Sequence, residues 1–310
     1  MMIDLTNYDV KRLFKDEGFE NGFDVLRVMN GAGAYDNPVG RFQYPESKGD
    51  PSWLLIQWYS RKCLVLDRKD TGSPYEITDE DNIKFVKYNP EEKSLLMTLN
   101  AKNAFKGKSK MEDMPFWPHL LIEQKNICDY KNMTDPEEKK FYSTAGDKVY
   151  AEFDMRVVDF KPTTNPEDLN AAQFVAYVYL QLVDAGHIYF GFNPFDNRGP
   201  IRFLWKKETG GSNWIYGLPT EVTFGSIENS FVPTPHDVKV SDEWKHIEVD
   251  LTPHIDNIIE MANKDMIFGR QVTKSDFYFS GTNMGFETHG NIDCAIEIKN
   301  YNIVSCFKKK

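Results

Sequence analysis

The stretch FVAYVYLQLVD (residues 174–184) is followed, after Ala185 and Gly186, by HIYFGFN (residues 187–193). Both runs alternate in the way expected of a half-buried β-strand, whose successive side chains leave opposite faces. The turn residues between the two runs, Asp184, Ala185 and Gly186, predict an antiparallel hairpin. One face of this hairpin would be apolar and would carry Phe174, Ala176, Val178, Leu180, Leu182, Ile188, Phe190 and Phe192.

The opposite face of the hairpin is unusual because a solvated strand face normally carries Lys, Glu and Thr. Here its members are aromatic, amide or imidazole side chains: Tyr177, Tyr179, Gln181, His187, Tyr189 and Asn193. Aromatic plates beside amide donors suit a sugar, which has an apolar C–H face and a rim of hydroxyls. The alternative is a second packed layer, since Tyr often lies half-buried with only its hydroxyl in water. The pattern favours a saccharide-contacting groove floor.

The rest of the chain predicts an all-β fold. Aromatic residues make up 14% of the sequence, which favours strands, and many short strand-like runs are separated by turn residues. We expect a two-sheet antiparallel sandwich with long loops and one short helix over residues 253–264, which Thr252 would cap. Residues 1–310 would form one domain, with residues 1–20 as an extension. The strands are expected at residues 53–59, 64–68, 83–88, 94–99, 119–124, 149–160, 174–183, 187–192, 201–205, 246–251, 277–280 and 293–304.

Charge and targeting signals limit the partners. The net charge of −10 argues against nucleic acid, because phosphate binding needs a basic field. No apolar run is long enough to cross a bilayer, and no signal peptide is present, so the sequence predicts a cytoplasmic protein with no membrane partner, or a secreted one whose leader was removed. The four cysteines lack CxxC spacing and are expected to be buried thiols.

Two later segments resemble known proteins. The run FYFSGTNMGFETHG (residues 277–290), followed by a long alternating strand, and the run WKHIEVDL (residues 244–251) resemble the closing strands of bacterial carbohydrate-active jelly-roll domains. The resemblance covers residues 149–305 and implies a concanavalin A-like sandwich with a concave saccharide face. It also implies a structural calcium ion, for which Asp293 is a candidate ligand; no other cofactor is expected. The Glu-x-Asp-x-x-Glu strand of related glucanases is absent, which favours binding over hydrolysis.

Several polar side chains are nevertheless candidates for catalysis. His119 and Glu123 would share a strand face, but four residues separate them by roughly 13 Å, so a substrate would have to lie between them. Glu287 and His289 would also share a face, as an acid–base pair or as structural hydrogen-bonding groups. A hydrolase would use Glu123 and Glu287, and a polysaccharide lyase would use His187 as the base beside Tyr189.

One further candidate contact lies nearer the N-terminus. Gln57 would line the groove with a neighbouring aromatic residue, unless Trp58 is in the core and Trp53 at a surface edge.

The leading hypothesis is a carbohydrate-binding sandwich that contacts an oligo- or polysaccharide. A carbohydrate-active enzyme and a protein-interaction sandwich are the alternatives. An acidic polysaccharide would fit only if Arg41, Arg198 and Arg202 lie together.

Overall fold

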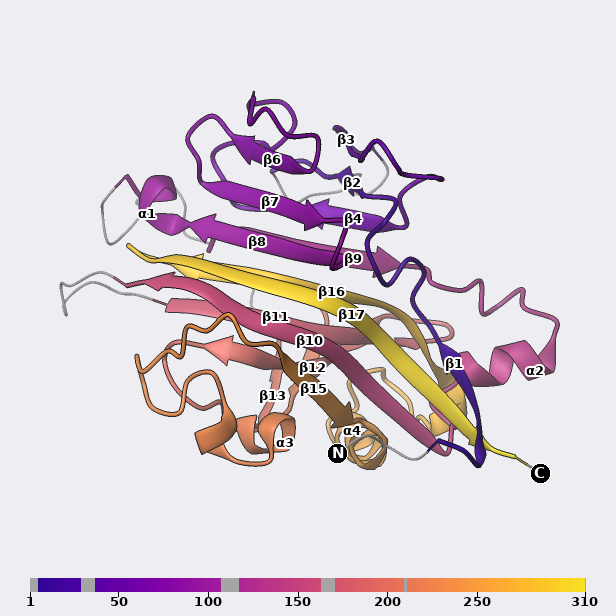
Figure 1. Cartoon of the computed structure of the whole chain (residues 1–310). Helices are drawn as coiled ribbons and strands as arrows, with labels where there is room; N and C mark the ends of the chain where they lie inside the picture. Colours follow the sequence, from indigo (N-terminus) through magenta and orange to yellow (C-terminus); the bar gives the residue numbers. More distant parts are fainter. Residues whose placement is uncertain (1–4, 29–36, 107–116, 163–170, 209–210, 310) are drawn as a thin grey trace.

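The computed structural model describes residues 5–28, 37–106, 117–162, 171–208 and 211–309. Within these ranges the strands form two sheets that pack face to face, which confirms the expected β-sandwich (Figure 1). Most neighbouring strands are antiparallel, and the exceptions are two parallel pairs, β2 with β4 and β12 with β14. The two sheets pack face to face because period-2 alternation leaves each of them one apolar face to bury.

The first sheet has eight strands in the described residues. Its longest members lie side by side, and β1 adds to the outer part of β17. In spatial order the strands are β15 (Lys245–Asp250), β10 (Lys148–Lys161), β17 (Asp293–Lys308), β8 (Ser94–Asn100), β7 (Lys84–Asn89), β6 (Glu76–Asp79) and β5 (Arg68–Lys69), with β1 (Tyr8–Arg12) paired to β17.

The second sheet has nine strands in the described residues and contains the hairpin from which the fold was predicted. That hairpin, β11 and β12, lies near the centre of the sheet, with β16 on its other side. The order is β13 (Leu204–Lys207), β14 (Trp214–Gly217), β12 (His187–Asp196), β11 (Ala171–Leu182), β16 (Phe277–His289), β9 (His119–Lys125), β4 (Trp53–Ile56), β2 (Phe23–Val25) and β3 (Gly40–Phe42).

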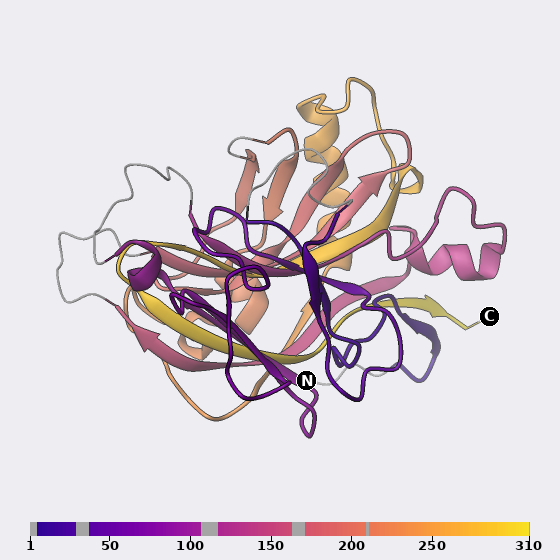
Figure 2. The ribbon, with the colours of Figure 1, turned by 90° about the horizontal axis from the view of Figure 1, so that it is seen from above.

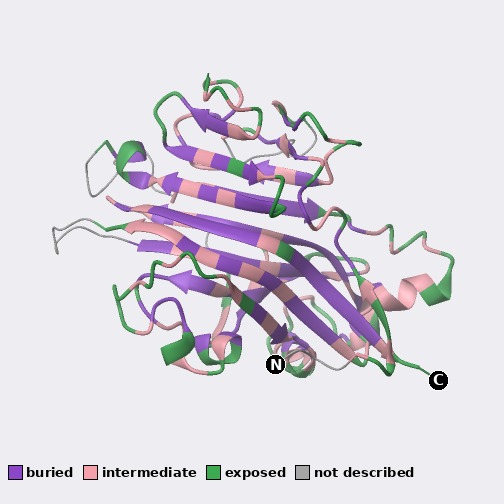
Figure 3. Ribbon diagram, viewed as in Figure 1, coloured by how far each residue is buried: buried purple, intermediate pink, exposed green. Residues whose placement is uncertain are grey.

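The core lies between the two sheets and is rich in aromatic rings. Phe153 of β10 stacks on Phe192 of β12 across the interface, with ring centroids 6.1 Å apart. Tyr301 of β17 lies 6.2 Å from Trp53 of β4, which is fully buried. Figure 3 shows that β17 is buried over most of its length, whereas buried and intermediate residues alternate along much of β10. Trp53 therefore belongs to the core, whereas the alternative interpretation placed it at a surface edge.

Helices are short, apart from the predicted one. They are α1 (Ala101–Ala104), α2 (Pro136–Lys139), α3 (Thr220–Phe224) and α4 (Thr252–Lys264), with 3₁₀ turns at Lys140–Tyr142, Ile227–Asn229 and Lys274–Asp276. Helix α4 buries Ile255, Ile258 and Ala262, as its spacing predicts. Thr252 does not cap it, because its hydroxyl accepts the N–H of Val149 instead.

The N-terminal segment is part of the sandwich rather than an extension. Strand β1 pairs along the end of β17, with Tyr8 opposite Lys308 (Figures 1 and 2). Phe14 and Phe19 then enter the core. The four cysteines are free thiols, three of them buried. No helix among the described residues is long and apolar enough to span a bilayer.

Candidate functional site

The polar side of the hairpin lies on the face of the nine-stranded sheet that points away from the eight-stranded sheet; we call this side the outer face. In the β11–β12 register Tyr179 is opposite Tyr189, Gln181 is opposite His187, and Tyr177 is opposite Gly191. The alternate residues of both strands belong to the core. This confirms that the hairpin places its polar and aromatic set on one surface. A Cβ at Gly191 would lie 2.0 Å from the carbonyl oxygen of Ala176, so only glycine allows the two strands to approach here.

Three of these rings pack together on the outer face. The His187 ring lies 4.9 Å from that of Tyr179 and 4.7 Å from that of Tyr189, perpendicular to the latter. Burial, with a smaller effect from the Lys125 charge, lowers the pKa of His187 to about 4, so its imidazole is neutral at pH 7. Its Nε2 atom is buried and has no hydrogen-bond partner in the described structure. As a base, His187 would reach a substrate only if the surrounding rings moved.

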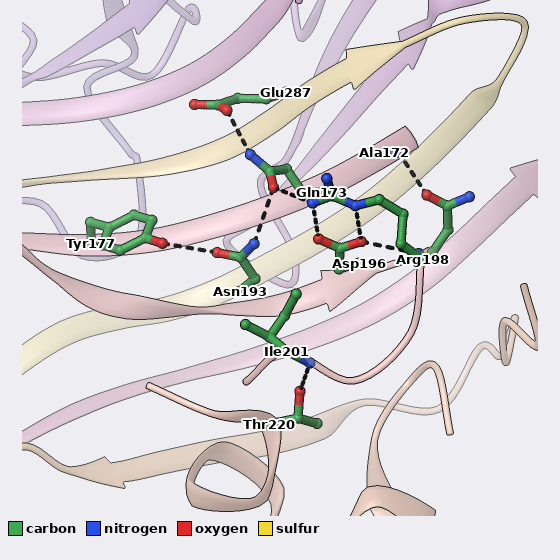
Figure 4. Close-up of polar contacts among 10 residues, drawn as sticks. Ala172, Gln173, Tyr177, Asn193, Asp196, Arg198, Ile201, Thr220 and Glu287 are labelled. Atoms are coloured by element: carbon green, nitrogen blue, oxygen red, sulfur yellow. Dashed lines mark hydrogen bonds and ion pairs between the residues drawn. The ribbon is translucent and has the colours of Figure 1, made fainter. Parts of the chain in front are cut away.

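A chain of hydrogen bonds crosses the outer face next to these rings (Figure 4). The Tyr177 hydroxyl donates to Asn193 Oδ1 at 3.1 Å, and Asn193 Nδ2 donates to Gln173 Oε1 at 3.2 Å. Gln173 Nε2 then donates to Glu287 Oε2 at 2.6 Å. Two strands of the hairpin and strand β16 are thereby linked by side-chain amides that end on a carboxylate.

Arg198, in the loop after β12, donates a hydrogen bond to the same chain of side chains. Its Nε donates to Asp196 Oδ1 at 2.8 Å, and its Nη2 donates to Gln173 Oε1 at 2.8 Å. Asp196 is buried, and its hydrogen bond raises the pKa of Arg198 further. Arg41, Arg198 and Arg202, which an acidic polysaccharide would need side by side, do not cluster: Arg41 lies on the edge strand β3, which five strands separate from β12, and it pairs with Asp24 at 2.8 Å.

Glu287 is the candidate catalytic carboxylate that remains accessible. Its side chain is 28% exposed, and its Oε1 lies 3.8 Å from Nε2 of His119. Burial lowers the pKa of His119, and the charge of Glu287 opposes this effect. Glu123 has a different environment: its side chain is 1% exposed and its Oε1 lies 3.2 Å from Lys125 Nζ.

The strand register also separates the two carboxylates proposed for a hydrolase. Glu287 is opposite His119 in the β16–β9 pair, whereas Glu123 is opposite Asn283. Four residues along a strand correspond to roughly 13 Å. The structure therefore does not place Glu123 and Glu287 side by side, and the same spacing separates His119 from Glu123.

Two polar residues of this face were missed from the sequence. Gln173 precedes the quoted alternating run by one residue, so extending that run backwards would have found it. Glu208 follows β13 and carries no sequence signal. Burial, together with the charge of Glu287, raises the pKa of Glu208, and a hydrogen bond with Asn213 opposes this. Burial also raises the pKa of Tyr189, and the charges of Glu208, Glu123 and Glu287 add to this effect.

Other candidate residues have structural roles. Gln57 is fully buried, so it lines no groove. It donates to the carbonyl of Leu26 at 2.7 Å and accepts the N–H of Leu64 at 2.9 Å, just beyond strand β4, which ends at Ile56. Gln181 Nε2 donates to carbonyls of its own hairpin turn. The His289 ring contacts Phe105 and Trp117 at the end of β16.

The proposed calcium ligand lacks supporting carboxylates. An oxygen of Asp293 accepts the N–H of Lys102 at 3.3 Å. Within the described ranges, no group of three or more His, Cys, Asp or Glu side chains could hold a metal ion. The donor set around Asp293 therefore does not fit the calcium ion that the resemblance implies.

Comparison with known proteins gives similarities of fold. No protein-family model and no curated protein sequence matches the chain. Its structure is similar to the xyloglucanase domain of NopAA from Sinorhizobium fredii in complex with cellobiose, with TM-score 0.40 and 6% identity over 84% of this chain and 94% of that one. It is also similar to endoglucanase Cel12A from Rhodothermus marinus, with TM-score 0.36 and 10% identity over 84% and 100%.

A third similar structure is the family 11 xylanase from Neocallimastix patriciarum, with TM-score 0.31 and 7% identity over 74% and 86% of the two chains. The similarity to all three is distant and is one of fold. The two-sheet sandwich of this chain rests on the strand pairing above.

Proposed function

We propose that the outer face of the nine-stranded sheet binds an oligo- or polysaccharide. The observation that carries the proposal is the continuous chain from Tyr177 through Asn193 and Gln173 to Glu287, directly beside the ring of Tyr189. Tyr177 and Tyr189 lie 6.4 Å apart at a steep angle. Their rings supply apolar surface for the C–H face of a sugar, and the amides supply both donors and acceptors for its hydroxyls.

The charges on this face favour an uncharged saccharide. Near the chain of amides, Arg198 pairs with Asp196 and Lys125 lies beside Glu123. Glu287 and Glu208 have amide partners. A uronate or sulfated polymer would meet the carboxylates of Glu287 and Glu208 beside this chain of amides, and like charges in a partly buried site repel strongly.

Binding can be tested with soluble xyloglucan, cellohexaose, xylohexaose and polygalacturonate as probes. We expect intrinsic fluorescence and calorimetry to detect at least one neutral probe and not polygalacturonate. Tyr189→Ala should weaken that binding by about 10- to 100-fold, because aromatic anchors dominate such contacts. Tyr8→Ala, on the opposite side of the sandwich, is the control and should leave binding unchanged. Equal affinity in both variants, with unchanged melting temperatures, would contradict the proposal.

Hydrolysis of a glycosidic bond is the second candidate function. The exposed carboxylate of Glu287 favours it, and hydrolases are what the names of the similar structures describe. A reaction would require a second carboxyl group within reach of the same bond. Reducing-end release from the same neutral probes, lost in Glu287→Gln, would support this alternative. An increase in absorbance from unsaturated products of polygalacturonate would instead indicate the lyase that His187 and Tyr189 suggest.

A further inference from the structure

The segment that follows β4, residues 57–62, brings two aromatic rings to the outer face. Trp58 packs against a small apolar cluster whose members alternate with core residues along β9 and β11, and Tyr177 of the proposed saccharide site packs against the same cluster. The His119 ring lies 6.2 Å from that of Trp58 and 5.3 Å from that of Tyr59. Because His119 is opposite Glu287 in the β9–β16 register, Tyr59 lies at the Glu287 end of this face.

The backbone at Tyr59 has an unusual conformation. Its φ of 57° lies in the left-handed region, which a bulky side chain seldom adopts. Such a residue persists only where its surroundings impose the conformation, and these residues are concentrated at functional sites. The Tyr59 N–H donates to the carbonyl of Val28 at 2.9 Å, and the carbonyl of Trp58 accepts the N–H of His119 at 2.9 Å. The turn that directs the Tyr59 ring beside His119 is thus held by backbone bonds on both sides.

A lysine from the other sheet also holds this segment. Lys84 of β7 is fully buried between the sheets, like Val86 two residues later. Its Nζ donates to Ser60 Oγ at 2.6 Å and to the carbonyl of Lys62. Hydrogen bonds from an ammonium group are about twice as strong as those between neutral groups. Lys84 therefore links the eight-stranded sheet directly to the segment that carries Tyr59.

The Lys84 side chain keeps its charge at neutral pH. Burial lowers the pKa of Lys84 to about 8, and the charges of Asp79, Cys63 and Asp67 oppose this effect, so the ammonium is protonated at pH 7. Asp79 is also buried, and its carboxylate accepts the backbone N–H of Lys84 at 2.8 Å. A buried charge is costly unless it is hydrogen-bonded. The two oxygen acceptors in residues 57–62 are therefore held at the ammonium group.

We propose that Tyr59 is a further aromatic contact of the saccharide, and that Lys84 is the positioning residue that holds it on the outer face. The Tyr59 ring supplies apolar surface for a sugar ring beside Glu287, in addition to the surface of Tyr177 and Tyr189. Lys84 is fully buried, so it acts on the ligand only through residues 57–62. The proposal rests on the saccharide binding proposed above and extends that site towards β4.

The test is a double-mutant cycle on the full chain, with calorimetry of cellohexaose, xylohexaose and xyloglucan at pH 7. Tyr59→Ala should weaken binding by about 10-fold, because it removes an aromatic contact. Lys84→Met removes the charge at a similar side-chain length and should also weaken binding. In the Tyr59→Ala background it should have no further effect, because it acts through that ring. Lys87→Met is the matched control on the same strand: Lys87 is exposed, pairs with Glu76 at 3.1 Å, and should not affect affinity.

Amide hydrogen exchange shows where Lys84 acts. The His119 N–H, which donates to the Trp58 carbonyl, should exchange faster in Lys84→Met and at the wild-type rate in Lys87→Met. Ser60→Ala removes one acceptor of Lys84 and replaces Lys84→Met in the cycle if that variant does not fold. It should weaken binding in the wild-type background and not in the Tyr59→Ala background.

The cycle separates this proposal from the proposed function. Wild-type affinity in Tyr59→Ala, or in folded Lys84→Met, overturns the proposal. It is also overturned if the two losses multiply in the double variant, as they do for independent effects. The proposed function survives each of these results as long as Tyr189→Ala weakens binding. If the wild type binds none of the neutral probes, the proposed function fails and the role of Tyr59 and Lys84 fails with it.

Discussion

The two outer faces of the sandwich differ in how their polar groups are satisfied. On the eight-stranded sheet, a hollow of about 460 Å³ is lined by opposite charges that pair with one another. Arg12 binds Glu17 at 3.0 Å, His246 binds Asp154 at 2.8 Å, and Asn300 donates to the same Asp154 at 2.7 Å. On the nine-stranded sheet, two amides connect Tyr177 to the accessible carboxylate of Glu287.

This difference cannot come from the backbone, because both faces are built from the same kind of pleated strand. Exposed ion pairs are the ordinary chemistry of a solvated surface and contribute little to stability. Half-buried aromatic rings are costly to leave in contact with water, and rings beside amides are suited to a ligand that has both apolar and hydroxyl groups. This contrast is the reason that the saccharide site is proposed on the nine-stranded sheet and not on the eight-stranded one.

The largest effect is expected from the pH dependence of His187. The folded pKa of about 4 is below the ordinary value of 6.5, so between these values the unfolded chain binds more protons. This stabilising contribution is complete above pH 6.5 and is lost as the pH falls towards 4, by on the order of 3 kcal/mol. His187→Phe should remove this loss, as measured by urea unfolding at pH 7, 5 and 4. If His187→Phe left the difference in unfolding free energy between pH 7 and pH 4 unchanged from the wild type, the His187 ring would not be buried in solution.

A smaller effect is expected from a matched pair of arginines, one on each face. Arg198 and Arg12 are 45% and 49% exposed, but the Asp196 partner of Arg198 is 1% exposed, whereas the Glu152 partner of Arg12 is 18% exposed. Arg198→Ala should lower the free energy of unfolding by about 2 kcal/mol, since it leaves a buried carboxylate without its cation. Arg12→Ala should lower it by less than about 1 kcal/mol. Equal losses in chemical denaturation would remove the distinction between the faces.

The smallest effect is expected from His246→Ala. The side chain is half exposed and its ion pair with Asp154 lies at the surface. The free energy of unfolding should change by no more than about 0.5 kcal/mol at pH 7, and saccharide affinity should not change. A loss of affinity in calorimetry would mean that the eight-stranded face takes part in binding.

Particular residues show how much of the fold and of the candidate site the sequence predicted. Tyr177, Tyr179, His187 and Tyr189 were placed on one face correctly, because the period of two is a local property of the strand. Gln57 was misplaced because β4 ends at Ile56 and Tyr59 adopts a positive φ of 57°, which the alternating pattern did not indicate. Strand β14, at Trp214–Gly217, is not among the strands expected from the sequence, since four residues are too few to establish a period.

The sequence by itself determined the composition of the outer face of the hairpin: which side chains of residues 174–193 share a side, and that they are aromatic rings, amides and an imidazole rather than Lys and Glu. Only the tertiary structure decided what lies next to them. Strand β16 comes more than a hundred residues later in the chain, and its pairing with β11 brings Glu287 to Gln173. The pleat follows from local geometry, whereas strand order depends on how the whole apolar surface is buried, and no short pattern encodes it.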